Sequence, residues 1–243
     1  MKVLPVLGRQ EGVREFYNEL LMNGVEENYD NPEVILVLGG DGTMLGAQRQ
    51  YYKRDIPFLG IGFGDINFLL HRQIKQPAQL AMALRKKGWK RFLAGGLRAY
   101  IDTDIGRQNG IAFNDVYIKS ANPTGVVRLR INTNEYQNKV VRGDGLIIAS
   151  PQGSTAYNRT AGGTILPIGS GLWAVTGICT SEKFNTAVSQ QQIEIDVLRG
   201  PAIAVTDNKI FTDVQRIKIV PSRYATEILF DSKENFEQRR YAL

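Results

Sequence analysis

One short segment of this sequence places an acid among glycines that suit phosphate binding. Gly39-Gly40-Asp41-Gly42-Thr43 follows an apolar run and precedes a predicted helix. Glycines at the C-terminal end of a buried strand let backbone N–H groups approach phosphate oxygens closely. A carboxylate would repel a phosphate there, unless it binds a metal or accepts a proton from an attacking hydroxyl. The segment therefore predicts phosphoryl transfer with Asp41 as the catalytic residue; the alternative is a plain turn in which Asp41 caps the helix.

Two further segments have the residue types that bind the base and sugar of a nucleotide. Alternating glycines follow the next predicted strand, and their loop ends in Phe68. Phe68 can stack on a base, with core packing as the alternative. The pair Asn114-Asp115 lies in a predicted strand, where only one of two adjacent side chains faces a given ligand. The amide of Asn114 can bind ribose hydroxyls or the amide of a nicotinamide, and an edge or turn pair is the alternative.

A fourth segment combines small hydroxyl residues with glycines. Arg142-Gly143-Asp144-Gly145 leads into a predicted strand, which opens into Gly153-Ser154-Thr155-Ala156-Tyr157. Such residues offer backbone and side-chain hydrogen bonds to sugar or phosphate oxygens. A nucleophilic Ser154 would need a partner base, and none is visible in the sequence. The segment therefore predicts ligand binding.

The elements that must position these residues change character along the chain. Apolar runs at 2–7, 33–38 and 57–61 predict strands, and the run at 33–38 is typical of a parallel strand buried on both faces. Helical spacing predicts helices over 12–22, 43–52 and 77–87. Strands that alternate with helices indicate a parallel sheet with crossover helices.

After about Gly88 the pattern becomes one of short strands rich in β-branched residues. We predict strands at 98–103, 111–120, 126–132, 139–141, 146–150, 193–197, 203–206 and 217–220. We therefore expect an N-terminal Rossmann-like α/β domain over residues 1–92, on which 229–243 packs back. A C-terminal, β-rich and sandwich-like NAD-binding domain is expected over 93–228, on the resemblance described below.

Composition narrows the class of protein. The chain has 243 residues, 43% of them hydrophobic, and a net charge of +6, with the basic residues spread out. This distribution favours a solvated surface over a nucleic-acid patch. No apolar run approaches the roughly 20 residues of a membrane helix, and no export signal is visible. The single cysteine, Cys179, excludes an intramolecular disulfide and is expected to be buried, whereas His71 is expected at the surface or at a helix cap.

In their order along the chain, these segments closely resemble the NAD kinase family. The matching features are Gly-Gly-Asp-Gly-Thr, a glycine loop ending in Phe-Leu, an Asn-acid pair, an Asp-Gly segment, and Gly-Ser-Thr-Ala-Tyr with trailing glycines. The resemblance covers about residues 34–163. The glycine-acid segment alone is also similar to lipid kinases and phosphofructokinases.

The resemblance implies roles for the residues at matching positions. Asp41 is the catalytic base or a metal contact, and Gly39, Gly40, Gly42 and Thr43 form the phosphate-side loop. Phe68 lies near the adenine, Asn114 and Asp115 hold the ribose, Asp144 lies near the nicotinamide end, and Thr155, Ala156 and Tyr157 contact adenine and ribose. Asp207 corresponds to a later Asp-Gly pair, with Asn208 in place of the glycine. We also assign Arg142 and Thr160 to the nucleotide-binding set.

On this resemblance, the chain is expected to transfer the γ-phosphate of ATP to the 2'-hydroxyl of the adenosine ribose of NAD, with polyphosphate as another possible donor. Mg²⁺ or Mn²⁺ is expected as the metal, without a dedicated protein cage, because Mg²⁺ usually borrows phosphate oxygens. The resemblance also implies a cytoplasmic homodimer or homotetramer. Neither nucleic acid nor membrane is expected as a partner.

The sequence departs from the family pattern at four places. Asp115 replaces the glutamate of the Asn-Glu pair, Gly62 stands where a polar residue is usual, and Asn67 stands where glycine is usual. Residues 176–188 match only weakly. These departures leave two alternatives open: a catalytically weak or inactive NAD(P)-binding sensor, or a kinase of the same superfamily that acts on a lipid or sugar. The segment 153–157 argues against a lipid kinase.

Overall fold

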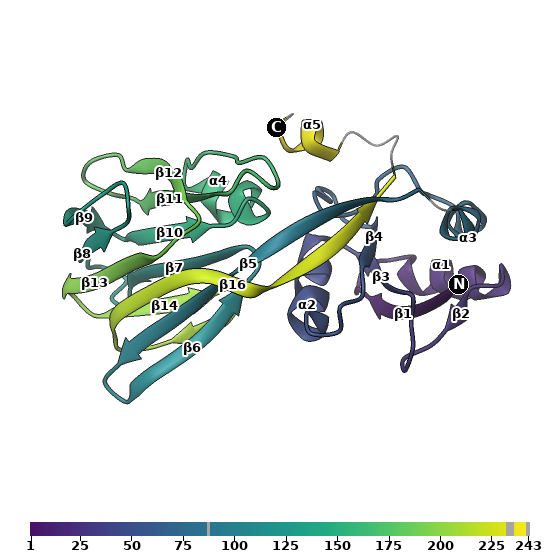
Figure 1. Cartoon of the computed structure of the whole chain (residues 1–243), viewed down its shortest axis with the longest axis horizontal. Helices are drawn as coiled ribbons and strands as arrows, with labels where there is room; N and C mark the ends of the chain where they lie inside the picture. The colour runs from purple at the N-terminus through teal and green to yellow at the C-terminus, as the bar shows by residue number, and fades with distance from the viewer. Residues whose placement is uncertain (87, 232–235, 242–243) are drawn as a thin grey trace. The chain divides into compact units, whose positions relative to one another are not determined.

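The computed structural model describes residues 1–86, 88–231 and 236–241, which form two compact units. The first unit comprises Met1–Leu93 and Ala225–Leu243, and the second comprises Ala94–Tyr224. Two long strands, β5 (Lys90–Thr103) and β16 (Val214–Phe230), have residues in both units (Figure 1). No helix in the described ranges is long and apolar enough to cross a membrane.

The first unit is built on a parallel sheet with the strand order β2-β1-β3-β4-β16. The new strands are β1 (Lys2–Leu7), β2 (Glu26–Glu27), β3 (Val34–Gly39) and β4 (Phe58–Gly62). Every residue of β3 is buried, as its continuous apolar run predicted. The last residues of β16 complete this sheet beside β4.

Helices cover both faces of this sheet. The helices α1 (Val13–Met22) and α3 (Pro77–Arg85) pack on each other and share a core with Leu36 and Leu38 of β3. On the opposite face lies α2 (Asp41–Tyr51), whose Met44 fills the space beside Gly60. The predicted helices are thus confirmed, although Lys87, where the third was expected to end, lies outside the described residues. The last described helix is α5 (Phe236–Tyr241).

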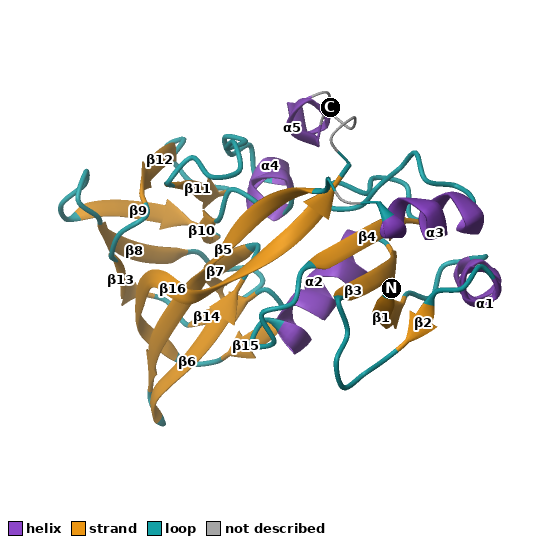
Figure 2. Ribbon diagram, turned by 45° about the vertical axis from the view of Figure 1, so that its right-hand side comes forward, coloured by secondary structure: helices purple, strands orange, loops and turns teal. Residues whose placement is uncertain are grey.

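The second unit consists almost wholly of antiparallel strands (Figure 2). One sheet has the order β12-β11-β10-β7-β14-β15, and the other joins β13, β8 and β9 to β16, with β5 and β6 paired beside it. The strand bounds are β6 Gly106–Ala112, β7 Asp115–Ser120, β8 Val127–Asn132, β9 Lys139–Gly143, β10 Gly145–Ala149, β11 Leu172–Ile178, β12 Asn185–Ser189, β13 Ile193–Arg199, β14 Ala202–Thr206 and β15 Lys209–Phe211. A 3₁₀ turn, Gly153–Thr155, and a short helix α4, Tyr157–Thr160, lie between β10 and β11.

A continuous apolar core fills the space between these two sheets. It takes Val116 and Ile118 from β7 and Leu129 and Ile131 from β8, which belong to different sheets. Because side chains alternate along a strand, the residues between them face away from this core. The expected combination of an α/β unit and a sandwich-like β unit is therefore confirmed.

The structure corrects several expected strands. The predicted strand 111–120 is interrupted, since β6 ends at Ala112 and β7 begins at Asp115. Residues 176–188, which matched weakly in sequence, contribute to β11 and β12. The strand expected at 217–220 extends over 17 residues as β16. In the expected C-terminal return, residues 232–235 and 242–243 lie outside the described ranges.

Candidate functional site

Asp41 lies where β3 passes into α2, at the carboxyl edge of the parallel sheet. Gly40 is the N-cap of α2, so Asp41 is the first helical residue and not the cap. Its carboxylate is fixed by two backbone donors: the Phe68 N–H donates to Oδ2 at 2.9 Å and the Leu69 N–H to Oδ1 at 2.7 Å. Each carboxylate oxygen has a second lone pair for a proton or a metal. The glycine loop after β4 therefore orients the acid that the sequence singled out.

The glycines around Asp41 differ in what surrounds them. A Cβ on Gly39 would lie 2.5 Å from Thr43 Oγ1, so the approach of Thr43 requires a glycine there. A Cβ on Gly42 would meet nothing within 4 Å. Gly42 thus leaves space beside the first turn of α2, where the positive end of the helix dipole favours an anion. Phe68 is buried, with 7% of its surface exposed, and offers little surface for stacking in this structure.

The structure adds a segment that the sequence analysis missed. Gly8, directly after β1, donates its N–H to the Leu38 carbonyl at 2.7 Å, and Gln10 Nε2 lies 3.3 Å from where a Cβ on Gly40 would stand. The carboxyl ends of the parallel strands β1 and β3 meet at one edge, which brings the two loops together. A glycine directly after the first predicted strand was the available signal.

Gly62 and Asn67, two positions at which the glycine loop departs from the family pattern, compensate each other. Asn67 has φ 52°, a conformation that glycine adopts most easily. Its side chain accepts a hydrogen bond from the Gly64 N–H at 3.2 Å and donates to the Gly64 carbonyl. A Cβ on Gly62 would lie 2.5 Å from Asn67 Cγ. The Asn67 side chain therefore occupies the space that a side chain at position 62 would need.

In the second unit, the expected pair Asn114-Asp115 lies at the interruption between β6 and β7. The Asp207 carboxylate accepts hydrogen bonds from the backbone N–H groups of Phe113 at 2.9 Å, Asn114 at 3.0 Å and Asp115 at 3.3 Å. Asp207 itself has φ 52° at the turn from β14 to β15. An acid from a distant turn thus satisfies the amides where the strand is interrupted.

The segment after β10 is bound to this interruption by short contacts. The Ser150 hydroxyl donates to the Phe113 carbonyl at 2.5 Å and accepts from the Gly153 N–H at 3.0 Å. Gly153 lies so close to the Asn114 carbonyl that any side chain there would clash. Gln152 Nε2 donates to Asn114 Oδ1 at 3.0 Å. The structure therefore brings Asn114 and the segment from Gly153 together.

Asp115, Tyr117 and Tyr157 gather on the face of the six-stranded sheet that is turned away from the sandwich core. Tyr117 and Tyr157 contact edge to face, with ring centroids 5.3 Å apart. Burial and the charge of Asp207 raise the pKa of Asp115 to about 7 from its ordinary 3.8. Burial, followed by the charges of Cys179, Asp115 and Asp144, raises the pKa of Tyr157. This face therefore holds a buried acid that titrates near neutrality.

The raised pKa of Asp115 makes stability depend on pH in a defined direction. Below about pH 4 the carboxyl is protonated in both the folded and the unfolded chain, and its burial carries no ionisation penalty. Between about pH 4 and 7 the unfolded chain ionises this carboxyl while the folded chain keeps it protonated, so stability falls as the pH rises, and the loss is complete once the buried acid ionises above about pH 7. The largest loss, for a pKa raised from 3.8 to about 7, is about 4 kcal/mol.

The remaining expected site residues are distributed as follows. Thr155 is buried, with its hydroxyl donating to the Gln152 carbonyl at 3.3 Å, and Ala156 is partly buried. Thr160 and Asp144 are exposed. Arg142 is exposed on β9. The structure thus groups Asn114, Asp115 and the segment 153–157. Thr160 is joined to this segment through its backbone N–H, which donates to the Ala156 carbonyl at 3.4 Å, whereas Arg142 lies on β9.

Two expectations for single residues were wrong. His71 is buried at 1% exposure, with Nε2 3.1 Å from the Leu229 carbonyl and its ring between Trp89 and Phe230. Cys179 is exposed, in a left-handed turn with φ 45° directly after β11. The residues next to each in sequence do not decide its burial, which depends on the partners that tertiary packing supplies.

The geometry agrees with comparisons to known proteins. Residues 10–88 match the model of the ATP-NAD kinase N-terminal domain, and residues 113–229 match that of the ATP-NAD kinase C-terminal domain. The chain belongs to the ATP-NAD kinase family. Asp41 and its glycine loop fall in the first matched region, and the cluster around Asp115 falls in the second.

Relatives within the ATP-NAD kinase family are moderately similar. The NAD kinase of Rickettsia typhi is 29% identical over 86% of this chain and 84% of its own. NAD kinase 1 of Prochlorococcus marinus is 34% identical over 65% of this chain, and the match spans 55% of that protein. Among solved structures, an Archaeoglobus fulgidus NAD kinase in complex with ATP matches with TM-score 0.80 and 22% identity, covering both chains fully. Yeast NADH kinase complexed with NADH has TM-score 0.84 and 17% identity, covering 99% of this chain and 86% of that one.

The family implies a divalent metal, and the described residues fit one that is held mainly by phosphate oxygens. No group of three or more His, Cys, Asp or Glu side chains able to hold a metal occurs in the described part of the chain. The Asp41 carboxylate can add one protein ligand.

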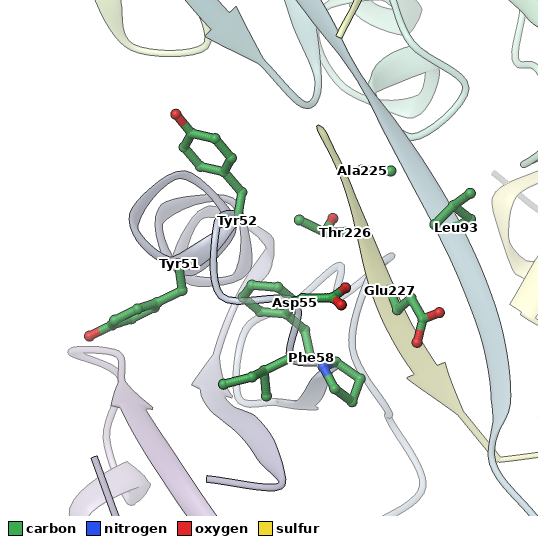
Figure 3. A pocket seen from close by; sticks show the side chains of 10 residues that line it. Tyr51, Tyr52, Asp55, Phe58, Leu93, Ala225, Thr226 and Glu227 are labelled. Carbon is green, nitrogen blue, oxygen red and sulfur yellow. The ribbon is translucent and has the colours of Figure 1, made fainter. Parts of the chain in front are cut away.

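A cavity of about 80 Å³ at the opposite end of α2, where Asp55 lies near Thr226 (Figure 3), is too small for a nucleotide.

Proposed function

We propose that this chain is an NAD kinase, which transfers the γ-phosphate of ATP to the 2'-hydroxyl of the adenosine ribose of NAD. Membership of the ATP-NAD kinase family supports the reaction class and the donor. The observation that carries the proposal is the Asp41 carboxylate, held by two backbone N–H groups beside the open space at Gly42. We also propose that the protein acts in the cytoplasm as a homodimer or homotetramer, which light scattering of the purified chain can test.

In this proposal Asp41 accepts the proton of the attacking ribose hydroxyl. Phosphoryl transfer depends mainly on position and charge neutralisation, so a base held in one orientation is the protein's main chemical contribution. The glycine-rich backbone at the N-terminus of α2 binds phosphate oxygens of the donor. Mg²⁺ or Mn²⁺, when bound, neutralises charge on the phosphates. Asn114, Asp115 and the segment 153–157 bind the NAD.

The decisive experiment measures NADP formation from NAD and ATP, with polyphosphate as a second donor, in wild type and Asp41→Asn. The substitution keeps the size of the side chain but removes its basicity, so we expect turnover to fall at least about 100-fold, the usual contribution of a general base. NAD binding by calorimetry should be unchanged. Asp65→Asn is the matched control, because Asp65 is an exposed acid in the same glycine loop.

Near-normal NADP formation by Asp41→Asn would refute the role of Asp41. A wild-type chain that binds NAD but forms no NADP with any donor would instead identify the protein as a sensor. Activity on a lipid or sugar hydroxyl, without activity on NAD, would support the remaining alternative.

A further inference from the structure

Three arginines lie in register on adjacent strands of the second unit. Arg142 of β9 pairs with Arg128 of β8. On its other side Arg128 pairs with Arg199 of β13, just beyond a shift in register between Val197 and Arg199. Residues directly opposite each other in an antiparallel sheet project from the same face. Neighbouring strands are about 4.8 Å apart, so the row spans roughly 10 Å. All three side chains are exposed. We call these residues the arginine row.

The charges next to this row are balanced, whereas those of the row are not. Two residues further along the strands, Arg130 pairs with Asp196 at 2.9 Å. Arg216 pairs with Glu194 at 2.5 Å and lies 3.4 Å from Asp196. Within the described residues, no acidic side chain forms an ion pair with a member of the arginine row. Like charges in directly opposed positions destabilise a sheet, so a bound anion would offset the repulsion between these arginines.

The arginine row also lines a concave surface. A cavity of about 540 Å³ is bounded by the three arginines together with Val126, Val127 and Val140. That volume is in the range of small-molecule sites. The planar guanidinium group binds phosphate through two parallel hydrogen bonds, which a lysine cannot reproduce. Shape, charge and donor geometry thus favour a phosphate ligand.

We propose that the arginine row binds a chain of linked phosphates, either inorganic tripolyphosphate or the phosphate chain of a free nucleotide. A linear ligand matches three cations in line better than a single orthophosphate does. A longer polyanion such as nucleic acid gains little, because the adjacent charges are already paired. The site goes beyond the proposed function, since binding there requires neither Asp41 nor NAD.

Footprinting with phenylglyoxal, which modifies exposed arginines, locates the site directly. At low ionic strength, tripolyphosphate should slow modification of Arg128 and Arg199, read by peptide mass spectrometry, and leave the exposed Arg223 unaffected. Equal protection by ATP would assign the site to nucleotide phosphates, and protection by tripolyphosphate alone would assign it to the inorganic chain. Arg142 is not used, because it also belongs to the proposed nucleotide-binding set.

Calorimetric titration of variants tests the energetics. Arg128→Gln and Arg199→Gln should each weaken tripolyphosphate binding by roughly fivefold, the loss of about one exposed charge pair. The matched control Arg223→Gln removes the same charge elsewhere on this unit and should have no effect. Tripolyphosphate that binds to the proposed donor loop does so in all of these variants. Differences in affinity between the variants therefore reflect binding at the arginine row.

Three results would overturn the proposal. One is unchanged tripolyphosphate affinity in Arg128→Gln/Arg199→Gln, with no footprint at either position in wild type. Another is protection by orthophosphate as strong as that by tripolyphosphate at equal phosphate concentration. A third is protection without any ligand that disappears on dilution, which would show that a second copy of the chain covers the row. None of these depends on whether the protein forms NADP.

Discussion

Replacing Gly62 with alanine should disturb the loop that holds the Asp41 carboxylate. The added Cβ would lie 2.5 Å from Asn67 Cγ and 2.7 Å from Nδ2, closer than real Cβ contacts allow. The side chain of Asn67 must then leave its place against Gly64. Because Phe68 follows directly and donates its N–H to Asp41, the disturbance reaches the proposed catalytic base.

The magnitude follows from the contacts that would be lost. Displacing Asn67 breaks its two hydrogen bonds to Gly64, each of which contributes about 1 kcal/mol. With residual crowding around the new Cβ, Gly62→Ala should lower the free energy of unfolding by about 2–3 kcal/mol. Asn67→Gly loses the same bonds but relieves the strain of φ 52°, which contributes about 1 kcal/mol, so its net cost is about 1 kcal/mol.

The double variant separates this explanation from a general sensitivity of the loop. Reducing Asn67 to glycine removes the three atoms nearest to the new Cβ, so the free energy of unfolding of Gly62→Ala/Asn67→Gly should fall by only about 1 kcal/mol. Independent effects would instead add to about 3–4 kcal/mol. The value of kcat for NADP formation should fall roughly tenfold or more in Gly62→Ala and recover in the double variant.

Urea unfolding followed by the fluorescence of Trp89, which packs against the core of the first unit, measures these differences. Gly46→Ala is the matched control, because its Cβ would meet nothing within 4 Å inside α2. It should stabilise the chain by about 0.5–1 kcal/mol. Additive costs in the double variant, or a destabilised control, would refute the reasoning.

Three further predictions test the second unit and the buried histidine. Asp115→Asn should flatten the pH dependence of stability, because it removes the buried acid that ionises. Relative to this variant, the free energy of unfolding of wild type should fall by up to about 4 kcal/mol between pH 4 and 8. Urea midpoints of the two proteins that change in parallel across that range would contradict the raised pKa. Asp207→Ala leaves three backbone N–H groups without their acceptor and should cost about 2–4 kcal/mol. It should also lower the pKa of Asp115 in an NMR titration, and an unmoved pKa would exclude Asp207 as a cause. His71→Leu should cost about 1–3 kcal/mol by thermal unfolding, because the Leu229 carbonyl loses its partner; an unchanged melting temperature would show that this contact is not stabilising.

Much of the first unit could be predicted because its signals are local. The run 33–38 is apolar at consecutive positions, and it became β3 with every residue buried. The glycines and Asp41 follow that strand directly, so their place at the sheet edge follows from chain continuity. The residues that fix the carboxylate, Phe68 and Leu69, already stood in a segment recognised for its glycines.

The parts that could not be predicted depend on residues far apart in sequence. The strand expected over 111–120 is interrupted because the carboxylate of Asp207 satisfies the amides at Asn114 from 93 residues away. The arginine row arises only from the pairing of β9, β8 and β13. No local pattern contains such a register, because cross-strand pairing is set by the whole sheet.

The sequence by itself determined the alternation of the main strands and helices in the first unit, the family pattern and the position of Asp41, because propensity and periodicity act within a few residues. Only the tertiary structure decided that Asn67 fills the space left by Gly62, that His71 is buried and Cys179 exposed, and that Asp115 lies against Asp207. These outcomes depend on which surfaces meet when distant segments pack. Burial, and the pKa values that follow from it, are properties of that packing.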